Sequence, residues 1–218
     1  TLVLDAPSDV LAILRTSSTG VRSVSIVEGT CDALSNVACT PVGSSPIRAA
    51  AYNLEAGTYH VVAETDSGGG SELSVLVRNP EAPQLVAFAD DCASAFVIPP
   101  TGGRFQGNTA NANAQYSAGC DQGGNTTFGA PEQMLTFTLD AKKRVVLDSR
   151  SSAYSVLLDV RQGPTCPGTE VTNGCTISSG TQRAYLDLTL EADRVFALLE
   201  SLQVRIDRSE IQRVAHQI

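Results

Sequence analysis

The chain has 218 residues, enough for one large or two moderate domains, and 42% of them are hydrophobic, which suffices for a buried core. Its formal net charge of −8 argues against nucleic-acid binding, because phosphate contacts need clustered Lys and Arg side chains. No apolar run approaches the roughly 20 residues of a membrane-spanning helix, so membrane insertion is not expected.

Short runs in which apolar and polar residues alternate dominate the chain, and this period of two is typical of half-buried strands. In the first half, the expected strands are 1–5, 22–28, 48–53, 58–65 and 71–78. In the second half, they are 135–139, 144–149, 154–162, 186–190, 195–200 and 203–207. Many short strands between turns predict an all-β fold of antiparallel β-sandwiches.

The C-terminal end departs from this pattern. Ser209 and Gln212 have the spacing of a capping box, and Ile211, Val214 and Ile218 recur at helical spacing. A short amphipathic helix is therefore expected at 208–218, with these three apolar side chains as a candidate assembly face.

An internal repeat divides the chain. The run from Ser23 to Cys31 resembles the run from Ser155 to Cys166, and in each copy a polar stretch, a second cysteine and a strand ending Leu-Glu-Ala follow at a nearly constant offset. The repeat predicts a first sandwich at 1–83, a linker at 84–90 and a second, complete sandwich at 91–207. By this comparison, the first copy lacks a counterpart of about 90–131.

Six cysteines in an even count point to three disulfides and hence to an oxidising compartment. A zinc site is disfavoured, because the chain has no C-x-x-C motif and only two histidines, His60 and His216. Of the 15 possible connectivities, repeat symmetry favours one, with each short loop stapled by its own bridge. The expected pairs are Cys31 with Cys39, Cys92 with Cys120 and Cys166 with Cys175.

The motifs of catalysis are largely missing. The sequence has no G-x-S-x-G nucleophile elbow, His60 lies in an expected strand, and His216 belongs to the expected tail helix. The Gly-rich stretch 66–72 links two expected strands, which fits a hairpin loop. It is not a phosphate-binding loop, because such a loop has a lysine and is followed by a helix. An enzyme is not expected, and neither is a cofactor other than calcium.

Asp90 and Asp91 are the candidate calcium ligands, because calcium takes carboxylate oxygens, although two acids at the start of a solvated linker also explain the pair. Phe105, Tyr116 and Phe128 lie in a Gly- and Asn-rich stretch. These aromatic side chains either line a binding surface or cap the ends of the sandwich.

Several motifs together resemble the bacterial pre-peptidase C-terminal (PPC) domain. In the second copy these are Asp91-Cys92-Ala-Ser-Ala95, the glycines at 102–103 and 107, Cys120, the run from Pro131 to Leu139 and the Cys166/Cys175 loop; in the first copy, the strand Leu54-Glu-Ala-Gly-Thr-Tyr-His-Val-Val62 carries the similarity. The resemblance implies a jelly-roll β-sandwich on a secreted or surface-exposed bacterial protein. Such domains are non-catalytic parts of secreted hydrolases or repeat within large surface proteins, and some bind calcium or extracellular polymers.

Two hypotheses for the function follow from these observations. The first is a structural or adhesive module of a bacterial surface protein or fibre, in which a neighbouring chain or repeat domain completes the first sandwich and assembly runs head to tail. The second is an accessory domain that binds a polysaccharide or protein substrate for a secreted hydrolase. A fragment of a longer protein would explain the missing part of the first copy without any assembly.

Overall fold

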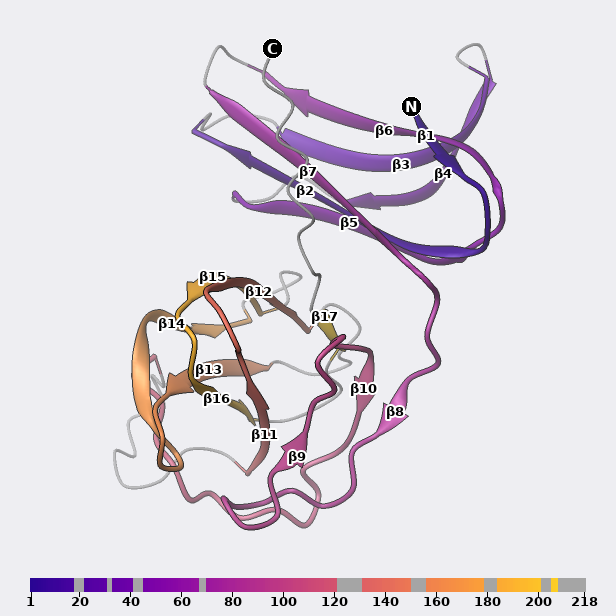
Figure 1. Ribbon diagram of the computed structural model, residues 1–218. Coiled ribbons are helices and arrows are strands. Elements are labelled where there is room, and N and C mark those ends of the chain that lie inside the picture. The colour runs from indigo at the N-terminus through magenta and orange to yellow at the C-terminus, as the bar shows by residue number, and fades with distance from the viewer. Residues whose placement is uncertain are drawn as a thin grey trace. The chain divides into compact units, whose positions relative to one another are not determined.

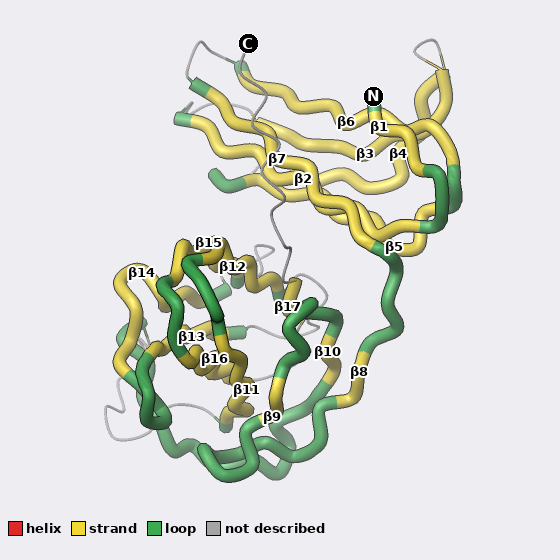
Figure 2. The backbone as a smooth tube through the Cα atoms, in the orientation of Figure 1, coloured by secondary structure: helices red, strands yellow, loops and turns green. Residues whose placement is uncertain are grey.

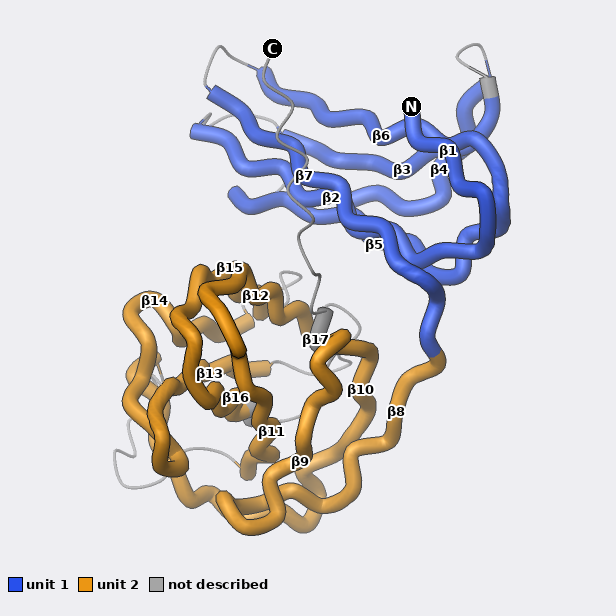
Figure 3. The backbone as a smooth tube through the Cα atoms, in the orientation of Figure 1, with its two compact units in different colours: residues 1–81 blue, residues 82–218 orange. Residues whose placement is uncertain are grey.

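In the computed structural model, the described residues are 1–17, 22–30, 33–40, 45–66, 70–120, 131–149, 156–178, 184–200 and 205–207. They form strands and loops and contain no helix (Figure 2), so the expected all-β class is confirmed. The expected tail helix at 208–218, with Ile211, Val214 and Ile218, lies outside the described residues. The chain divides into two compact units, Thr1–Glu81 and Ala82–Ile218 (Figure 3).

The first unit is built from two antiparallel sheets (Figure 1). One sheet has the order β1 (Leu2–Leu4), β6 (Gly57–Thr65), β3 (Arg22–Thr30) and β4 (Ala33–Thr40). The other has the order β5 (Ile47–Leu54), β2 (Ser8–Thr16) and β7 (Ser71–Arg78). Apolar side chains from both sheets form one core, as in a β-sandwich.

Strand β5 shows how the sequence produces this layered arrangement. Ile47, Ala49 and Ala51 are buried, whereas Arg48 and Ala50 between them are only half-buried. Successive side chains of a strand point to opposite faces, so this alternation places one face of β5 in the core and leaves the other partly in water.

Strand β2 was not expected from the sequence. Its residues Val10 to Leu14 form a continuous apolar run that is buried on both faces, because β2 is the central strand of its sheet. A run without alternation carries no period-two signal, so the sequence pattern did not predict this strand.

The second unit also contains two main sheets. The larger has the order β14 (Thr169–Ile177), β13 (Leu157–Gln162), β16 (Arg194–Glu200), β11 (Glu132–Thr138) and β9 (Phe96–Val97). The smaller has the order β15 (Tyr185–Leu190), β12 (Lys143–Asp148) and β17 (Arg205–Asp207), and a separate short pair joins β8 (Gln84–Leu85) to β10 (Phe105–Gln106). Side chains of both main sheets share one core, which also contains Ile98 and Phe105.

The two units have the same strand order apart from β9. The order β11-β16-β13-β14 in the second unit corresponds to β1-β6-β3-β4 in the first, and β15-β12-β17 corresponds to β5-β2-β7. The register agrees as well, since Cys39 of β4 is opposite Ser25 of β3, and Cys175 of β14 is opposite Asp159 of β13.

The stretches between Cys31 and Cys39 and between Cys166 and Cys175 were expected to be short polar loops. This expectation was wrong. Most of the first stretch is β4 and most of the second is β14, each the outer strand of its sheet. An edge strand keeps many polar side chains in water, so its sequence resembles that of a loop.

Candidate functional site

Two disulfides of the second unit join positions that repeat symmetry did not pair. Cys92 is bonded to Cys166 and Cys120 to Cys175, with Cα–Cα distances of 5.8 and 5.6 Å. The expected bridges Cys92–Cys120 and Cys166–Cys175 are therefore wrong. Cys175 lies on β14 and Cys166 in the turn before it, and each bonds the segment that carries Cys92 and Cys120 instead of stapling its own hairpin.

In the first unit, Cys39 is a free and exposed thiol. The expected bridge from Cys39 to Cys31 is thus not formed, and Cys31 itself lies outside the described residues. In the second unit, the disulfide partners come from the segment that precedes β11.

The disulfide-bonded segment of the second unit covers the outer face of the larger sheet. Met134 and Phe196 are completely buried on that face, and Cys92, Tyr116 and Cys166 pack against them. The Tyr116 hydroxyl lies 3.2 Å from the Cys92 sulfur, and burial raises the pKa of the phenol. These contacts place Cys92–Cys166 inside a small second core, shielded from solvent on one side.

Buried carboxylates fasten this covering segment to the sheet. Asp90 accepts hydrogen bonds from the backbone N–H and the side-chain amide of Asn113, at 2.7 and 2.5 Å. Glu132 on β11 has no exposed surface, and its Oε1 accepts the backbone N–H groups of Gln115 and Tyr116 at 2.8 and 2.9 Å. Hydrogen bonds to an ionised acceptor are among the stronger ones, so these acids hold the loop in place.

The candidate calcium ligands Asp90 and Asp91 each accept hydrogen bonds from neighbouring groups of the described chain. Both Asp90 oxygens accept hydrogen bonds from Asn113, while Asp91 Oδ1 accepts those of Ala93 N–H, Ser94 N–H and the Ser94 hydroxyl. The bonds from Ser94 are the main cause that lowers the pKa of Asp91. The geometry gives each acid a role in its own turn, and calcium at this pair stays a prediction.

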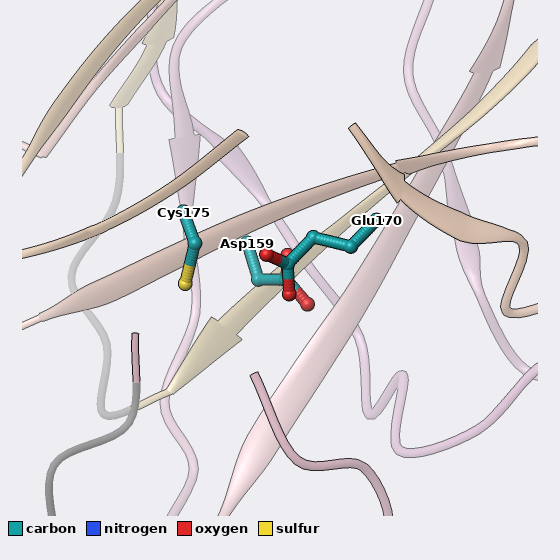
Figure 4. A group of neighbouring side chains, drawn as sticks. All are labelled: Asp159, Glu170 and Cys175. Atoms are coloured by element: carbon teal, nitrogen blue, oxygen red, sulfur yellow. The ribbon is translucent and has the colours of Figure 1, made fainter. Parts of the chain in front are cut away.

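A different cluster, which the sequence did not indicate, brings together Asp159, Glu170 and Cys175 (Figure 4), whose oxygen and sulfur atoms lie within 4.8 Å of one another. Asp159 is on β13 and is completely buried, and the other two residues are on the neighbouring strand β14. The Cys175 sulfur is consumed in a disulfide and cannot act as a thiolate ligand. Two carboxylates remain, too few for the six to eight oxygens that calcium takes.

Electrostatics favour the protonated form of Asp159 at this cluster. Burial is the largest cause that raises the pKa of Asp159, to about 6; the ion pair with Arg161 lowers it, and the nearby Glu170 carboxyl raises it further. The Arg161 guanidinium donates to Asp159 Oδ2 at 2.8 Å, and Oδ1 is buried without a hydrogen bond among the described residues. A proton between the two carboxyl groups would satisfy that oxygen.

The same cluster also anchors the covering segment. Glu170 Oε2 accepts the Gly119 N–H at 2.7 Å, and Arg161 donates to the Ser117 carbonyl at 2.7 Å. A Cβ atom on residue 119 would lie 2.5 Å from a Glu170 oxygen, so any other residue there would displace the Glu170 carboxyl group. Glu170 and the Asp159–Arg161 ion pair thus attach the loop beside the Cys120–Cys175 bridge to the sheet.

The remaining candidate residues are dispersed. Phe105 is buried in the core and makes an edge-to-face contact with Phe96, with ring centroids 5.5 Å apart, so it does not line an exposed surface. His60 lies on β6, where its Nδ1 is 3.3 Å from the Thr1 hydroxyl. Phe128 and His216 lie outside the described residues.

Sequence reasoning missed the Asp159–Glu170 pair for an identifiable reason. Asp159 sits inside an expected strand and Glu170 inside an expected turn, and the two meet only once β14 pairs with β13. The one available signal was an acid in the middle of an apolar strand, Leu157-Leu-Asp-Val160.

No protein-family model matches the chain, and no curated protein matches it significantly. Within the part of the chain that the structure describes, no helix has the length and hydropathy needed to span a bilayer. The two disulfides indicate an oxidising environment.

Proposed function

We propose that this chain is a non-catalytic, extracellular structural or adhesive module of a bacterial surface protein or fibre. It consists of two PPC-like, jelly-roll sandwiches in tandem and assembles head to tail. The shared strand order and register of the two units support the tandem arrangement. The oxidising environment indicated by the disulfides supports a secreted or cell-surface location.

One observation carries the non-catalytic part of the proposal: the buried acids hold the backbone. Asp9 accepts the Asn53 N–H at 2.9 Å and pairs with Arg78 in the first unit, while Asp90 and Glu132 accept backbone N–H groups in the second. Catalytic carboxylates instead face a site that a substrate can reach. Acids that hold loops to a sheet suit a protein whose task is to keep its shape outside the cell.

The test is light scattering coupled to size exclusion on the full chain over a range of concentrations, with electron microscopy of the high-mass fractions. Regular polymers whose mass grows with concentration are the expected result, because a heterologous contact that does not close produces a filament. A single species near 22.8 kDa at all concentrations would rule out assembly of this chain by itself.

An accessory substrate-binding domain of a secreted hydrolase is the second candidate, and exposed apolar side chains of the second unit favour it. Leu85, Phe88 and Val97 are 77%, 56% and 69% exposed. Apolar and aromatic side chains on a surface are common in binding sites for polymers. Co-sedimentation with insoluble polysaccharides and with collagen tests this function, and a Phe88→Ala variant should lose the binding if it is correct.

A further inference from the structure

The Cys120–Cys175 disulfide lies beside two carboxyl groups. The Cys175 sulfur and one oxygen each of Asp159 and Glu170 lie within 4.8 Å of one another, and Figure 4 shows the two carboxyl groups side by side next to Cys175. Asp159 is on β13, and Cys175 is directly opposite it on β14. The pairing of these strands therefore holds an acid next to a disulfide sulfur.

Two donors are in place for a negative charge on the Cys175 sulfur. One is the Cys120 backbone N–H, which donates to this sulfur at 3.2 Å. The other is Asp159, whose Oδ2 accepts from Arg161 while Oδ1 is buried without a hydrogen bond among the described residues, so that a proton on this acid belongs on Oδ1. Burial favours this protonated form and raises the pKa of Asp159 to about 6.

The second disulfide, Cys92–Cys166, has different surroundings. It packs against the buried side chains of Met134 and Phe196, and an apolar environment disfavours a thiolate. The Tyr116 hydroxyl lies 3.2 Å from the Cys92 sulfur, but burial raises the pKa of this phenol from its ordinary value of 10.0. A phenol of this kind holds its proton more tightly than a thiol does, so it is a poor proton donor to a departing sulfur.

Solvent reaches both ends of the Cys120–Cys175 bridge. Cys120 and Cys175 are each half-buried, so exposure does not decide which sulfur an external thiol attacks. The groups around Cys175 do decide it, because the sulfur that leaves is the one on which negative charge is stabilised. Cys120 is therefore the expected point of attack, and Cys175 the leaving group.

We propose that Cys120–Cys175 is a site of thiol–disulfide exchange with low-molecular-weight thiols, in which Cys120 is thiolated and Asp159 protonates the departing Cys175. The external thiolate bonds to the Cys120 sulfur, and the Cys120–Cys175 bond breaks with its electron pair on Cys175. That sulfur takes the proton of Asp159 through one water molecule, a bridge that a separation of up to 4.8 Å permits. Asp159 then regains from solvent the proton that the external thiol released on ionising.

A second thiol completes the reduction. Its thiolate attacks the mixed disulfide, the small-molecule disulfide leaves, and Cys120 is released as a thiolate. Two thiols thus supply the two electrons that reduce the bridge. The exchange frees the Cys120 end of the covering segment, while Cys92–Cys166 keeps the other end attached. This activity goes beyond the proposed structural function and does not depend on assembly.

The test follows both bridges in one molecule. The full chain carries Cys31→Ser and Cys39→Ser, so that neither side chain supplies a competing thiol. It is incubated with mercaptoethanol, which is small and uncharged, then alkylated with N-ethylmaleimide and mapped by mass spectrometry. We expect Cys120–Cys175 to open roughly tenfold faster than Cys92–Cys166 or more, with the mercaptoethanol adduct on Cys120 and the maleimide on Cys175. Equal rates, or an adduct mainly on Cys175, would overturn the proposal.

A sample unfolded in urea is the control for the sequence around each bridge. In the unfolded chain, the Asp159 carboxyl group and the Cys120 N–H are no longer held beside the Cys175 sulfur. The two bridges should then open at similar rates. A difference of the same size in urea would show that local sequence sets the rates, and would contradict a role of the folded site.

Asp159→Asn tests the proton donor. Its amide keeps the contact with Arg161 but has no acidic proton, so at about pH 5 the opening of Cys120–Cys175 should slow roughly tenfold or more. Leu158→Ala is the matched control, because it empties the fully buried neighbouring position and leaves the acid in place. It should not slow the opening. No slowing in Asp159→Asn, or the same slowing in both variants, would refute proton donation by Asp159.

A pH profile separates proton donation from a merely structural role. Rate constants are expressed per thiolate of the reagent, which removes the titration of mercaptoethanol. The constant for Cys120–Cys175 should fall as the pH rises through about 6, because Asp159 loses its proton there. The constant for Cys92–Cys166 should show no such fall. A fall that persists in Asp159→Asn would assign the donor to another group.

Glu170→Gln examines the other acid at the site. Asp159 faces Arg161 and Glu170, and the farther strands of the same face carry Glu132 on β11 and Arg194 on β16, the latter over the Phe196 ring. Of these groups only Glu170 is an acid at the bridge, and its amide variant keeps an acceptor for the Gly119 N–H. The variant should retain the fall of the rate constant, moved to lower pH, because Glu170 raises the pKa of Asp159. Loss of the fall in Glu170→Gln would overturn the role of Asp159.

Discussion

Asp159 and Glu170 bring their carboxyl groups within 4.8 Å of each other on the adjacent strands β13 and β14. Asp159 is completely buried, and Glu170 at the same time holds the Gly119 N–H of the covering segment. The pair therefore lies where the two strands meet the disulfide-bonded loop.

The pair predicts a pH dependence of the free energy of unfolding. The pKa of Asp159 is raised from 3.8 to about 6, so the folded state binds a proton that the unfolded state has released. The stabilisation is complete below about pH 4 and is lost as the pH rises through about 6. Urea unfolding at a series of pH values should show this loss.

Asp159→Asn should remove this decline of the free energy of unfolding with pH, because the amide keeps a hydrogen bond to Arg161 and no longer titrates. The difference between the wild type and the variant is the quantity to measure, since Asp91 and Asp140, with lowered pKa values, contribute slopes of the opposite sign. Asp140→Asn is a matched exposed control. An unchanged decline between pH 4 and 6 in Asp159→Asn would show that another group is responsible.

The disulfide pattern predicts unequal effects of cysteine substitutions. Replacing Cys92 and Cys166 together by serine should lower the free energy of unfolding by roughly 2–4 kcal/mol, because the bridge closes a long loop and packs against Met134. Cys39→Ser should change it little, since Cys39 is free and exposed. Denaturant unfolding measures both, and non-reducing peptide mapping that found Cys166 joined to Cys175 would contradict the pairing.

The buried anchor Asp90 predicts a local loss of stability. Asp90→Ala should cost roughly 1–3 kcal/mol, because the Asn113 N–H would lose its partner in a part-buried position. Glu191→Ala, which removes an exposed ion pair with Lys142, should cost less than about 1 kcal/mol. Unfolding in excess chelator excludes any contribution from calcium, and similar losses in the two variants would argue against the anchoring role.

The two units should unfold as separate cooperative blocks. Ile13→Ala and Leu147→Ala each empty a fully buried position, one in each core, and each should cost roughly 2–5 kcal/mol. Calorimetry should show that each variant lowers the midpoint of one transition only. Equal shifts of a single transition in both variants would show that the units unfold together.

Much of the fold could be predicted from the sequence because half-buried strands carry a period-two signal. Strands such as β5 and β15 alternate clearly, and their expected ranges agree with the structure to within a few residues. Strand β2 was missed because both its faces are buried, and β4 and β14 because edge strands resemble polar loops.

The disulfides and the acid pair could not be predicted for a different reason: they depend on which segments meet in space. Repeat symmetry singled out Cys166 and Cys175 as disulfide cysteines, which the structure confirms. It carried no information on the segment that lies over their sheet and supplies their partners. Once the path of residues 90–120 across the outer face of β11 and β16 is known, the partners Cys92 and Cys120 follow.

The central claim is that buried acids and two disulfides hold the segment of residues 90–120 against the larger sheet of the second unit. Amide hydrogen exchange of the full chain, resolved by NMR, tests it most directly. We predict that the amides of Asn113, Gln115, Tyr116 and Gly119 exchange slowly, because each donates to a carboxylate that lies on the sheet or beside it. Rapid exchange of these four amides, while the amides of β11 and β16 stay protected, would contradict the account.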